Sequence, residues 1–363
     1  MLCKKILTSQ AVPGMVSADD VYTFNNLLII KKNTCLTDRI ITRLKFYSIH
    51  EISVFVEDEV RLEDNNNPST MELSSSNAIS KTPEFRKFVT SFKENVEEFK
   101  ETIDDVVYND TPLDMDGLLS HTNQVLRKSR NGLHVLSMLH STRALDDLTY
   151  VHSFNVALIC NVFGRWLKFS NEDIRVLTLC GLLHDIGKIK VPDKIIKKPS
   201  KLTNVEFITA KMHTIKGYNI IKDKDIDSRI VNTILMHHER CDGSGYPNGL
   251  TGNQIDDFAK IVAIADVYDA MTSARIYRGP LCPFEVIELF ETEGYQKYDA
   301  HYLLTFLDGI VQTYIHNEVR LSNGQKGKIV MLNKNALTKP VIQSGKSFID
   351  LSKHKEISIL EIL

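Results

Sequence analysis

The sequence predicts a mainly α protein, in which a helical bundle is preceded by a small β-rich unit and followed by a short β appendage. From residue 83 to residue 318, apolar residues recur at steps of three and four, which is typical of amphipathic helices. Outside that region, short runs of β-branched and aromatic residues are bounded by turn-forming residues, which is typical of strands. The chain has 363 residues, 43% hydrophobic and 25% charged, so two or three globular units are expected.

The bulk composition argues against several kinds of partner. The net charge of −2 and the lack of a Lys/Arg block favour neither a nucleic-acid polymer nor a membrane surface. No apolar run approaches the roughly 18 residues of a membrane span, and no apolar stretch follows Lys4 and Lys5 as in a secretory signal. Six scattered cysteines without CxxC spacing indicate reduced thiols. We therefore predict a cytoplasmic protein.

Residues 1–62 are predicted to form the small β-rich unit. A strand, a turn and a second strand are expected within 21–30, and another strand at 52–56. The following segment, 63–82, is rich in Asn, Ser, Asp and Glu, which indicates a linker.

An amphipathic helical region is predicted over 83–143. Its first helix begins at Pro83, a residue suited to the first turn of a helix, and carries a stripe of Phe and Val residues. A second helix is predicted over 114–140. Aromatic stripes of this kind more often form a core or a dimer seam than a cofactor pocket, so we expect the region to pack on the bundle and to offer a homodimer contact.

The helical period continues through 144–320. A helix over 172–184 follows Ser170, with Asp173 three residues later as in a capping box, and a buried helix is expected over 258–274. Beyond it, Asn323-Gly324 indicates a hairpin turn, and strands are expected at 328–332 and 357–363. We assign 321–363 to the C-terminal β appendage.

The stretch from His237 to Pro247 carries the strongest chemical signal. Two adjacent histidines repel each other once protonated, so the pair makes sense if both rings are neutral and hold a metal. Further candidates are the dipeptide at 184–185 and single His and Asp residues elsewhere. Imidazoles with a bridging carboxylate suit two divalent transition-metal ions, and two ions roughly 3.5–4 Å apart commonly drive phosphodiester hydrolysis. The full candidate set is His152, His184, Asp185, His213, His237, His238 and Asp266.

The order of HD at 184–185, HHE at 237–239 and GYP at 245–247 resembles the HD-GYP branch of the HD phosphohydrolase superfamily. The resemblance implies an HD-type helical catalytic domain over 144–320. It also implies hydrolysis of the second messenger cyclic di-GMP at a dinuclear centre of iron or manganese. By resemblance, His152, His184, Asp185 and Asp266 hold one ion, and His213, His237 and His238 hold the other with Asp185 shared.

The resemblance suggests roles for residues around this centre. Lys188 would neutralise a phosphate oxygen and act with Asp185 in catalysis, while Arg275 and Arg278 would bind substrate phosphates. Tyr246 either touches the substrate or wedges the turn, and both readings stay open. Behind the ligands, Asp269 is expected to support a ligand histidine, and Asp242 to anchor the loop through backbone N–H groups.

One departure from the family affects the expected product. Relatives with a third metal place a Glu four residues before the first ligand histidine, where this chain has Leu148. We therefore expect a dinuclear centre and release of linear pGpG, with further cleavage to GMP left open. The alternatives are a phosphodiesterase for another cyclic dinucleotide such as cyclic GMP-AMP, and a non-catalytic cyclic di-GMP sensor. A diguanylate cyclase is a candidate protein partner.

Overall fold

The structure is a computed structural model that forms two compact units, residues 1–75 with 199–201, and residues 76–198 with 202–363. Helices predominate among the described residues, which confirms the predicted mainly α class. The predicted linker at 63–82 lies outside the described residues except for Thr82. The structure describes residues 2–8, 11–22, 28–37, 40–41, 43–44, 49, 51–56, 82–141, 148–198, 202–273 and 281–363.

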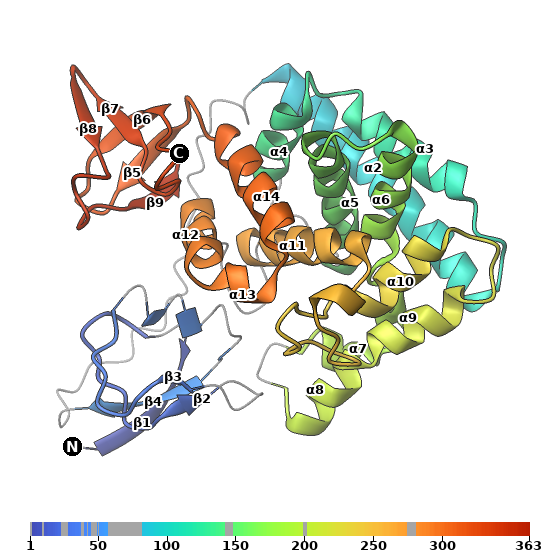
Figure 1. The fold of residues 1–363 in the computed structure, drawn as a ribbon, viewed down its shortest axis with the longest axis horizontal. Helices are drawn as coiled ribbons and strands as arrows, with labels where there is room; N and C mark the ends of the chain where they lie inside the picture. The colour runs from blue at the N-terminus through green and yellow to red at the C-terminus, as the bar shows by residue number, and fades with distance from the viewer. Residues whose placement is uncertain are drawn as a thin grey trace. The chain divides into compact units, whose positions relative to one another are not determined.

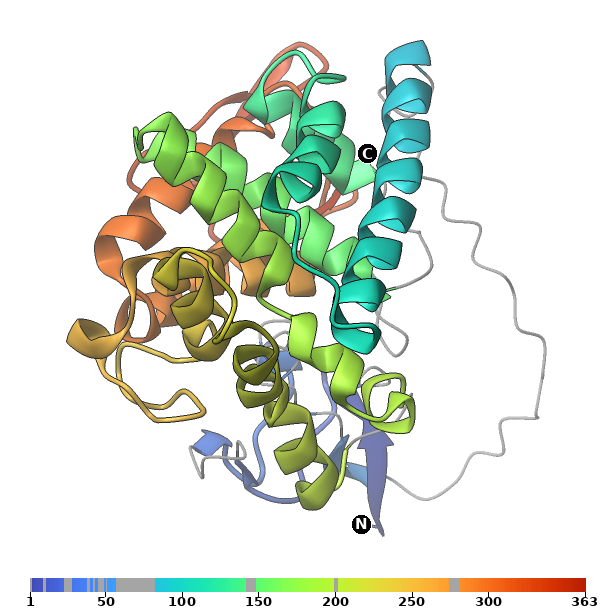
Figure 2. The ribbon, with the colours of Figure 1, turned by 90° about the vertical axis from the view of Figure 1, so that its right-hand side faces the viewer.

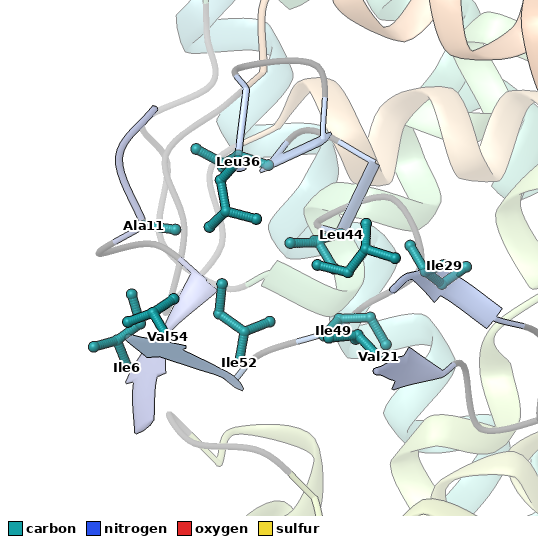
Figure 3. Packing of buried hydrophobic residues seen from close by; sticks show 11 residues of the cluster. Ile6, Ala11, Val21, Ile29, Leu36, Leu44, Ile49, Ile52 and Val54 are labelled. Atoms are coloured by element: carbon teal, nitrogen blue, oxygen red, sulfur yellow. The ribbon is translucent and has the colours of Figure 1, made fainter. Parts of the chain in front are cut away.

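The N-terminal unit contains two antiparallel strand pairs. Strand β1 (Leu2–Leu7) pairs with β4 (Glu51–Val56), and β2 (Val21–Tyr22) pairs with β3 (Leu28–Ile30). The strands predicted at 21–30 and 52–56 are present, whereas β1 was not predicted because its two exposed lysines interrupt the apolar alternation. Figure 3 shows the buried aliphatic core of this unit, which includes Ile6, Ala11, Val21, Ile29, Leu36, Leu44, Ile49, Ile52 and Val54.

In the second unit, helix α2 (Pro83–Tyr108) begins as predicted and buries its aromatic stripe. The Thr82 side chain accepts a hydrogen bond from the Phe85 N–H and caps the helix. Phe92 and Phe99 pack against Phe154 of the neighbouring helix, with ring centroids 5.4 and 6.1 Å apart. Figure 2 shows α2 running along the bundle. Since this stripe is buried within the chain, a homodimer would need a different surface.

The region predicted as one helix over 114–140 forms two, α3 (Met115–Leu126) and α4 (Gly132–Ser141). The prediction was wrong because polar side chains offer the backbone other partners between them. The Ser129 hydroxyl donates to the Leu126 carbonyl (2.7 Å), and the Asn131 side chain accepts from the His134 N–H (2.9 Å). Asn131 thus begins a new helix.

Helices α5 (Leu148–Trp166), α6 (Asn171–Leu183) and α11 (Asp257–Thr272) form the centre of the bundle (Figure 1). The predicted cap at the start of α6 is present: the Ser170 hydroxyl accepts from the Asp173 N–H at 3.1 Å. A Cβ at Gly181 would lie 2.7 Å from the Ala157 Cα, so glycine permits the close contact of α5 and α6.

The other described helical segments surround this centre. No described helix is long and apolar enough to cross a membrane. The segments are the 3₁₀ helices η3 (Ile186–Lys190) and η4 (Gly252–Gln254), the α-helices α7 (Asp193–Ile196), α8 (Asn204–Lys211), α9 (His213–Ile221), α10 (Ser228–Met236), α12 (Pro283–Leu289), α13 (Tyr295–Lys297) and α14 (Ala300–Gln312), and the π-helix η5 (Phe290–Gly294).

A five-stranded antiparallel sheet follows α14, in the order β8-β7-β6-β5-β9 (Figure 1). It begins at Glu318, three residues before the predicted boundary, and Gly324 takes the predicted turn with φ of 83°. The buried Tyr314 hydroxyl hydrogen-bonds the Tyr268 hydroxyl of α11, which ties the entry to the sheet to the bundle. The strands are β5 (Glu318–Leu321), β6 (Lys326–Met331), β7 (Val341–Ser344), β8 (Ser347–Asp350) and β9 (Ile359–Ile362).

Candidate metal centre

The structure brings the seven predicted metal ligands into one cluster within the helical bundle. Six of them are buried, and the His238 side chain is 18% exposed. They come from five places in the chain: His152 from α5, His184 and Asp185 from the end of α6, His213 from the start of α9, His237 and His238 from the end of α10, and Asp266 from α11.

Asp185 lies between two groups of imidazoles. Its Oδ2 is 3.7 Å from His152 Nε2 and 3.2 Å from His184 Nε2. Its Oδ1 is 3.3 Å from His213 Nε2 and 3.7 Å from His237 Nε2. We call the His152 and His184 side the first half of the centre, and the side of His213, His237 and His238 the second half. One carboxylate oxygen therefore faces each half, which is the geometry of a bridging ligand.

Asp266 also spans the centre. Its Oδ1 lies 3.0 Å from His152 Nε2, and its Oδ2 lies 3.8 Å from His238 Nδ1. The tightest donor groups are His152, His184 and Asp185 on one side, and Asp185 with the second-half histidines on the other. Asp266 thus lies against His152 of the first half and also faces His238 of the second half.

Hydrogen bonds set the orientation of four of the five imidazoles. Nδ1 of His184, His213 and His237 lies 2.7–3.1 Å from backbone carbonyls three or four residues upstream. A carbonyl can only accept, so Nδ1 carries a hydrogen, and in the neutral ring Nε2 directs a lone pair at Asp185. For His152, Nδ1 lies 2.7 Å from Asp269 Oδ2.

The donor set fits a divalent cation. The His213 and His237 Nε2 atoms are 3.4 Å apart, and both face the same carboxylate. Within the described part of the chain, buried His184 Nε2 and Asp185 Oδ1 have no hydrogen-bond partner. Lone pairs and carboxylate oxygens that converge in this way repel one another unless a cation lies among them.

The charge states also suit metal binding. Burial lowers the pKa of His213 to about 3 and holds the pKa of His238 well below its usual range. For Asp185, burial acts in the opposite direction, but the Lys188 and His184 charges hold its pKa well below the usual value. At neutral pH the His213 and His238 rings are therefore neutral and the Asp185 carboxylate is ionised, as metal coordination requires.

Lys188 lies beside the bridging carboxylate. Helix α6 ends at Leu183 and the chain turns into η3, so Lys188 is not on a shared helix face with His184. Its Nζ is 2.5 Å from Asp185 Oδ2. A Cβ at Gly187 would lie 1.9 Å from the His213 carbonyl oxygen, so only glycine allows η3 to approach α9 this closely.

Two supporting residues had no predicted role. Glu239 is 2% exposed, and its carboxylate accepts from the Asn248 and Leu250 N–H groups at 2.7 and 2.9 Å. Its signal in the sequence was a carboxylate placed directly before a Gly-rich loop, whose N–H groups need acceptors. Asn155 donates to Asp269 Oδ1 at 3.0 Å and had no sequence signal that we identified.

The remaining predicted residues lie around the loop or outside the described residues. Asp242 Oδ1 accepts from the Ser244 N–H at 2.9 Å. Tyr246 stacks on His238, with centroids 4.7 Å apart and planes at 29°. Arg275 and Arg278 lie outside the described residues.

Known proteins resemble this chain over the same region. A cyclic di-GMP phosphodiesterase of Pseudomonas aeruginosa is 34% identical over 212 residues, 58% of this chain and 51% of the relative. The 3'3'-cGAMP-specific phosphodiesterase 1 of Vibrio cholerae is 38% identical over 156 residues, 43% of this chain and 36% of the relative. The chain thus spans about half or less of the length of these relatives.

A solved structure and a family model complete the comparison. An HDG"Y"P protein from Bdellovibrio bacteriovorus has a TM-score of 0.52 and 16% identity, covering 85% of this chain and 99% of that one, so the likeness is one of fold. The family model described as HD domain matches residues 120–302, half of this chain. The HD, HHE and GYP motifs resemble those of the HD-GYP branch. The chain belongs to the HD domain family, in which divalent metals are bound.

Proposed function

We propose that this chain is a metal-dependent phosphodiesterase that hydrolyses cyclic di-GMP to linear pGpG. The observation that carries the proposal is Asp185, with one carboxylate oxygen facing each group of imidazoles. A centre that holds two cations around a shared carboxylate suits in-line displacement at a phosphodiester. The relatives named as cyclic di-GMP phosphodiesterases support the choice of substrate.

The proposed cofactors are two divalent ions, iron or manganese. His152, His184, Asp185 and Asp266 would hold one, and the second-half histidines with Asp185 the other. When bound, the ions supply Lewis acidity at the phosphodiester. The protein's contribution is to present neutral rings and ionised carboxylates in fixed orientations.

Lys188 is proposed to act on the substrate phosphate. Its ammonium lies beside Asp185, and its side chain is 21% exposed, so it can reach a phosphate oxygen as negative charge develops. Arg275 and Arg278 are proposed to bind the phosphates as well. Because Leu148 replaces the ligand of a third ion, we propose pGpG as the main product.

A second candidate substrate is cyclic GMP-AMP. The Vibrio cholerae relative with that specificity is 38% identical over its matched region, so the helical scaffold alone does not decide between the two nucleotides. A non-catalytic cyclic di-GMP sensor is less well supported, because all seven ligands of the centre are intact. A homodimer, a diguanylate cyclase partner and a cytoplasmic location complete the proposal.

The test uses the full chain purified without oxygen, with ferrous iron or with manganese. Cyclic di-GMP and 3'3'-cGAMP are supplied separately, and the products are identified by chromatography and mass. We expect pGpG from cyclic di-GMP only when metal is present, and none with His184→Ala. Faster cleavage of cyclic GMP-AMP would transfer the activity to that nucleotide. Binding of cyclic di-GMP without cleavage would favour a sensor.

A further inference from the structure

His238 differs from the other four histidines of the centre. Ligand histidines usually hydrogen-bond through the ring nitrogen that does not meet the metal, which fixes the ring. His152, His184, His213 and His237 do so through Nδ1. Within the described part of the chain, the His238 ring makes no such bond, and its Nδ1 lies 3.8 Å from Asp266 Oδ2. Something else must therefore set its orientation.

The ring of Tyr246 packs against the face of the His238 imidazole. It stacks on the His238 imidazole at 4.7 Å and 29°. The Lys211 ammonium also contacts the Tyr246 ring, with its Nζ 4.7 Å from the ring centroid. The same Nζ lies 4.8 Å from the centroid of the Phe207 ring. His238 and Lys211 therefore both lie against the ring of Tyr246.

The backbone of the loop holds Tyr246 in this position. The buried Glu239 carboxylate accepts hydrogen bonds from the backbone N–H groups of Asn248 and Leu250, which follow Tyr246 in the chain. A Cβ at Gly245 would lie 2.4 Å from the Glu239 Cα, so the loop also contacts the backbone of the HHE segment directly. The loop is thereby fixed to the same segment that carries His238.

We propose that Tyr246 is a positioning residue for the metal ligand His238, and that Glu239 acts through it by fixing the loop. The stacked ring does for His238 what a hydrogen bond does for the other four histidines. The inference rests on the proposed two-metal centre, and it assigns the tyrosine of the GYP motif to building the second half. Its hydroxyl is not needed for that role.

The test is a calorimetric titration of metal-free full-length protein with Mn²⁺, without nucleotide. Wild type should show two sites. Tyr246→Leu removes the aromatic face and should weaken one site by about 10- to 100-fold, the range for lost support of a ligand. Tyr246→Phe keeps the face and should bind within about twofold of wild type. Glu239→Gln keeps one acceptor oxygen of two, so its loss should lie between these values.

Ser244→Ala is the matched control, since it alters the same loop without touching the stack and should keep both sites. Circular dichroism checks that each variant folds. Should Tyr246→Leu not fold, the Mn²⁺ affinity of Glu239→Gln tests the proposal in its place. Unchanged affinity in Tyr246→Leu and Glu239→Gln would overturn the proposal, as would an equal loss in Tyr246→Phe. Because no nucleotide is present, failure of the proposed hydrolysis would leave this result intact.

Discussion

The two halves of the metal centre are built in different ways. The first half takes His152 from within α5, and Asp266 from within α11 closes it, with side chains 4% and 7% exposed; these helices pack tightly at the bundle centre. Its other histidine, His184, lies at the end of α6. The second half takes all its histidines from helix ends: His213 opens α9, and His237 and His238 follow α10. Packing of helix bodies therefore fixes His152 and Asp266, whereas the second half depends on local hydrogen bonds and a loop. We expect the second half to be the more easily disturbed.

The largest expected effect removes the residue that both halves share. Asp185→Asn keeps the shape of the side chain but loses the charge that faces four imidazoles. We expect both cations to be lost and activity to fall to background, measured as metal content and as product formed. The control is Asp193→Asn, an exposed carboxylate paired with Lys197, which should retain both ions. Retention of one ion in Asp185→Asn would show that the halves are independent.

Gly187→Ala should damage the second half more than the first. The added Cβ meets the His213 carbonyl and the Gly217 backbone, neither of which can yield as a side chain can. Overpacking of this kind typically costs about 1–3 kcal/mol of unfolding free energy. Urea unfolding and Mn²⁺ titration measure the two effects. Gly164→Ala is the matched control, since its neighbours at 3.1 and 3.3 Å are flexible side chains. Equal losses of stability and Mn²⁺ affinity in the two variants would contradict the role given to the contact between Gly187 and α9.

Asp269→Asn tests the first half alone. The carboxylate orients His152, and its loss should weaken one Mn²⁺ site by about tenfold. The second site should not change, because its rings have other partners. Calorimetric titration of the metal-free variant with Mn²⁺ separates the two sites. Loss of affinity at the second-half site alone would contradict the role given to Asp269.

The last prediction is a pH dependence of the metal-free protein, whose effect across a single pH unit is small. The pKa of His213 is about 3 in the fold, below roughly 6.5 for a free imidazole. The unfolded chain therefore binds a proton in this range that the folded chain does not. The free energy of unfolding that this ring contributes is fully present above about pH 6.5. It is lost as the pH falls toward about 3, by up to about 1.4 kcal/mol per pH unit. Urea unfolding at several pH values measures the slope. In His213→Gln, the free energy of unfolding should depend less steeply on pH. An unchanged dependence would show that His213 is not its cause.

Much of the fold could be predicted because its signals are local. Ser170 with Asp173 marks the start of α6, and Asn323-Gly324 marks the turn before β6. The break between α3 and α4 was missed although residues 127–132 carry no apolar side chain. Ser129 and Asn131 redirect the backbone within this polar stretch. Strand β1 was missed because only its pairing with β4 explains it.

The candidate site divides in the same way. The motif order identifies the seven predicted ligands, whose side chains the structure brings together. The residues that orient the ligands could not be found from spacing. Asn155 and Asp269 are 114 positions apart, and the Glu239 acceptor atoms meet N–H groups nine and eleven residues later. Such contacts depend on how helices and loops meet in space.

The hydrogen bonds from the loop to Glu239 have a consequence for predicting metal binding in diverged relatives. On our proposal, a relative that kept all seven predicted ligands but lost Glu239 or the aromatic ring at Tyr246 would hold its second ion loosely. Nine positions, rather than seven, would then decide whether such a chain can bind both ions.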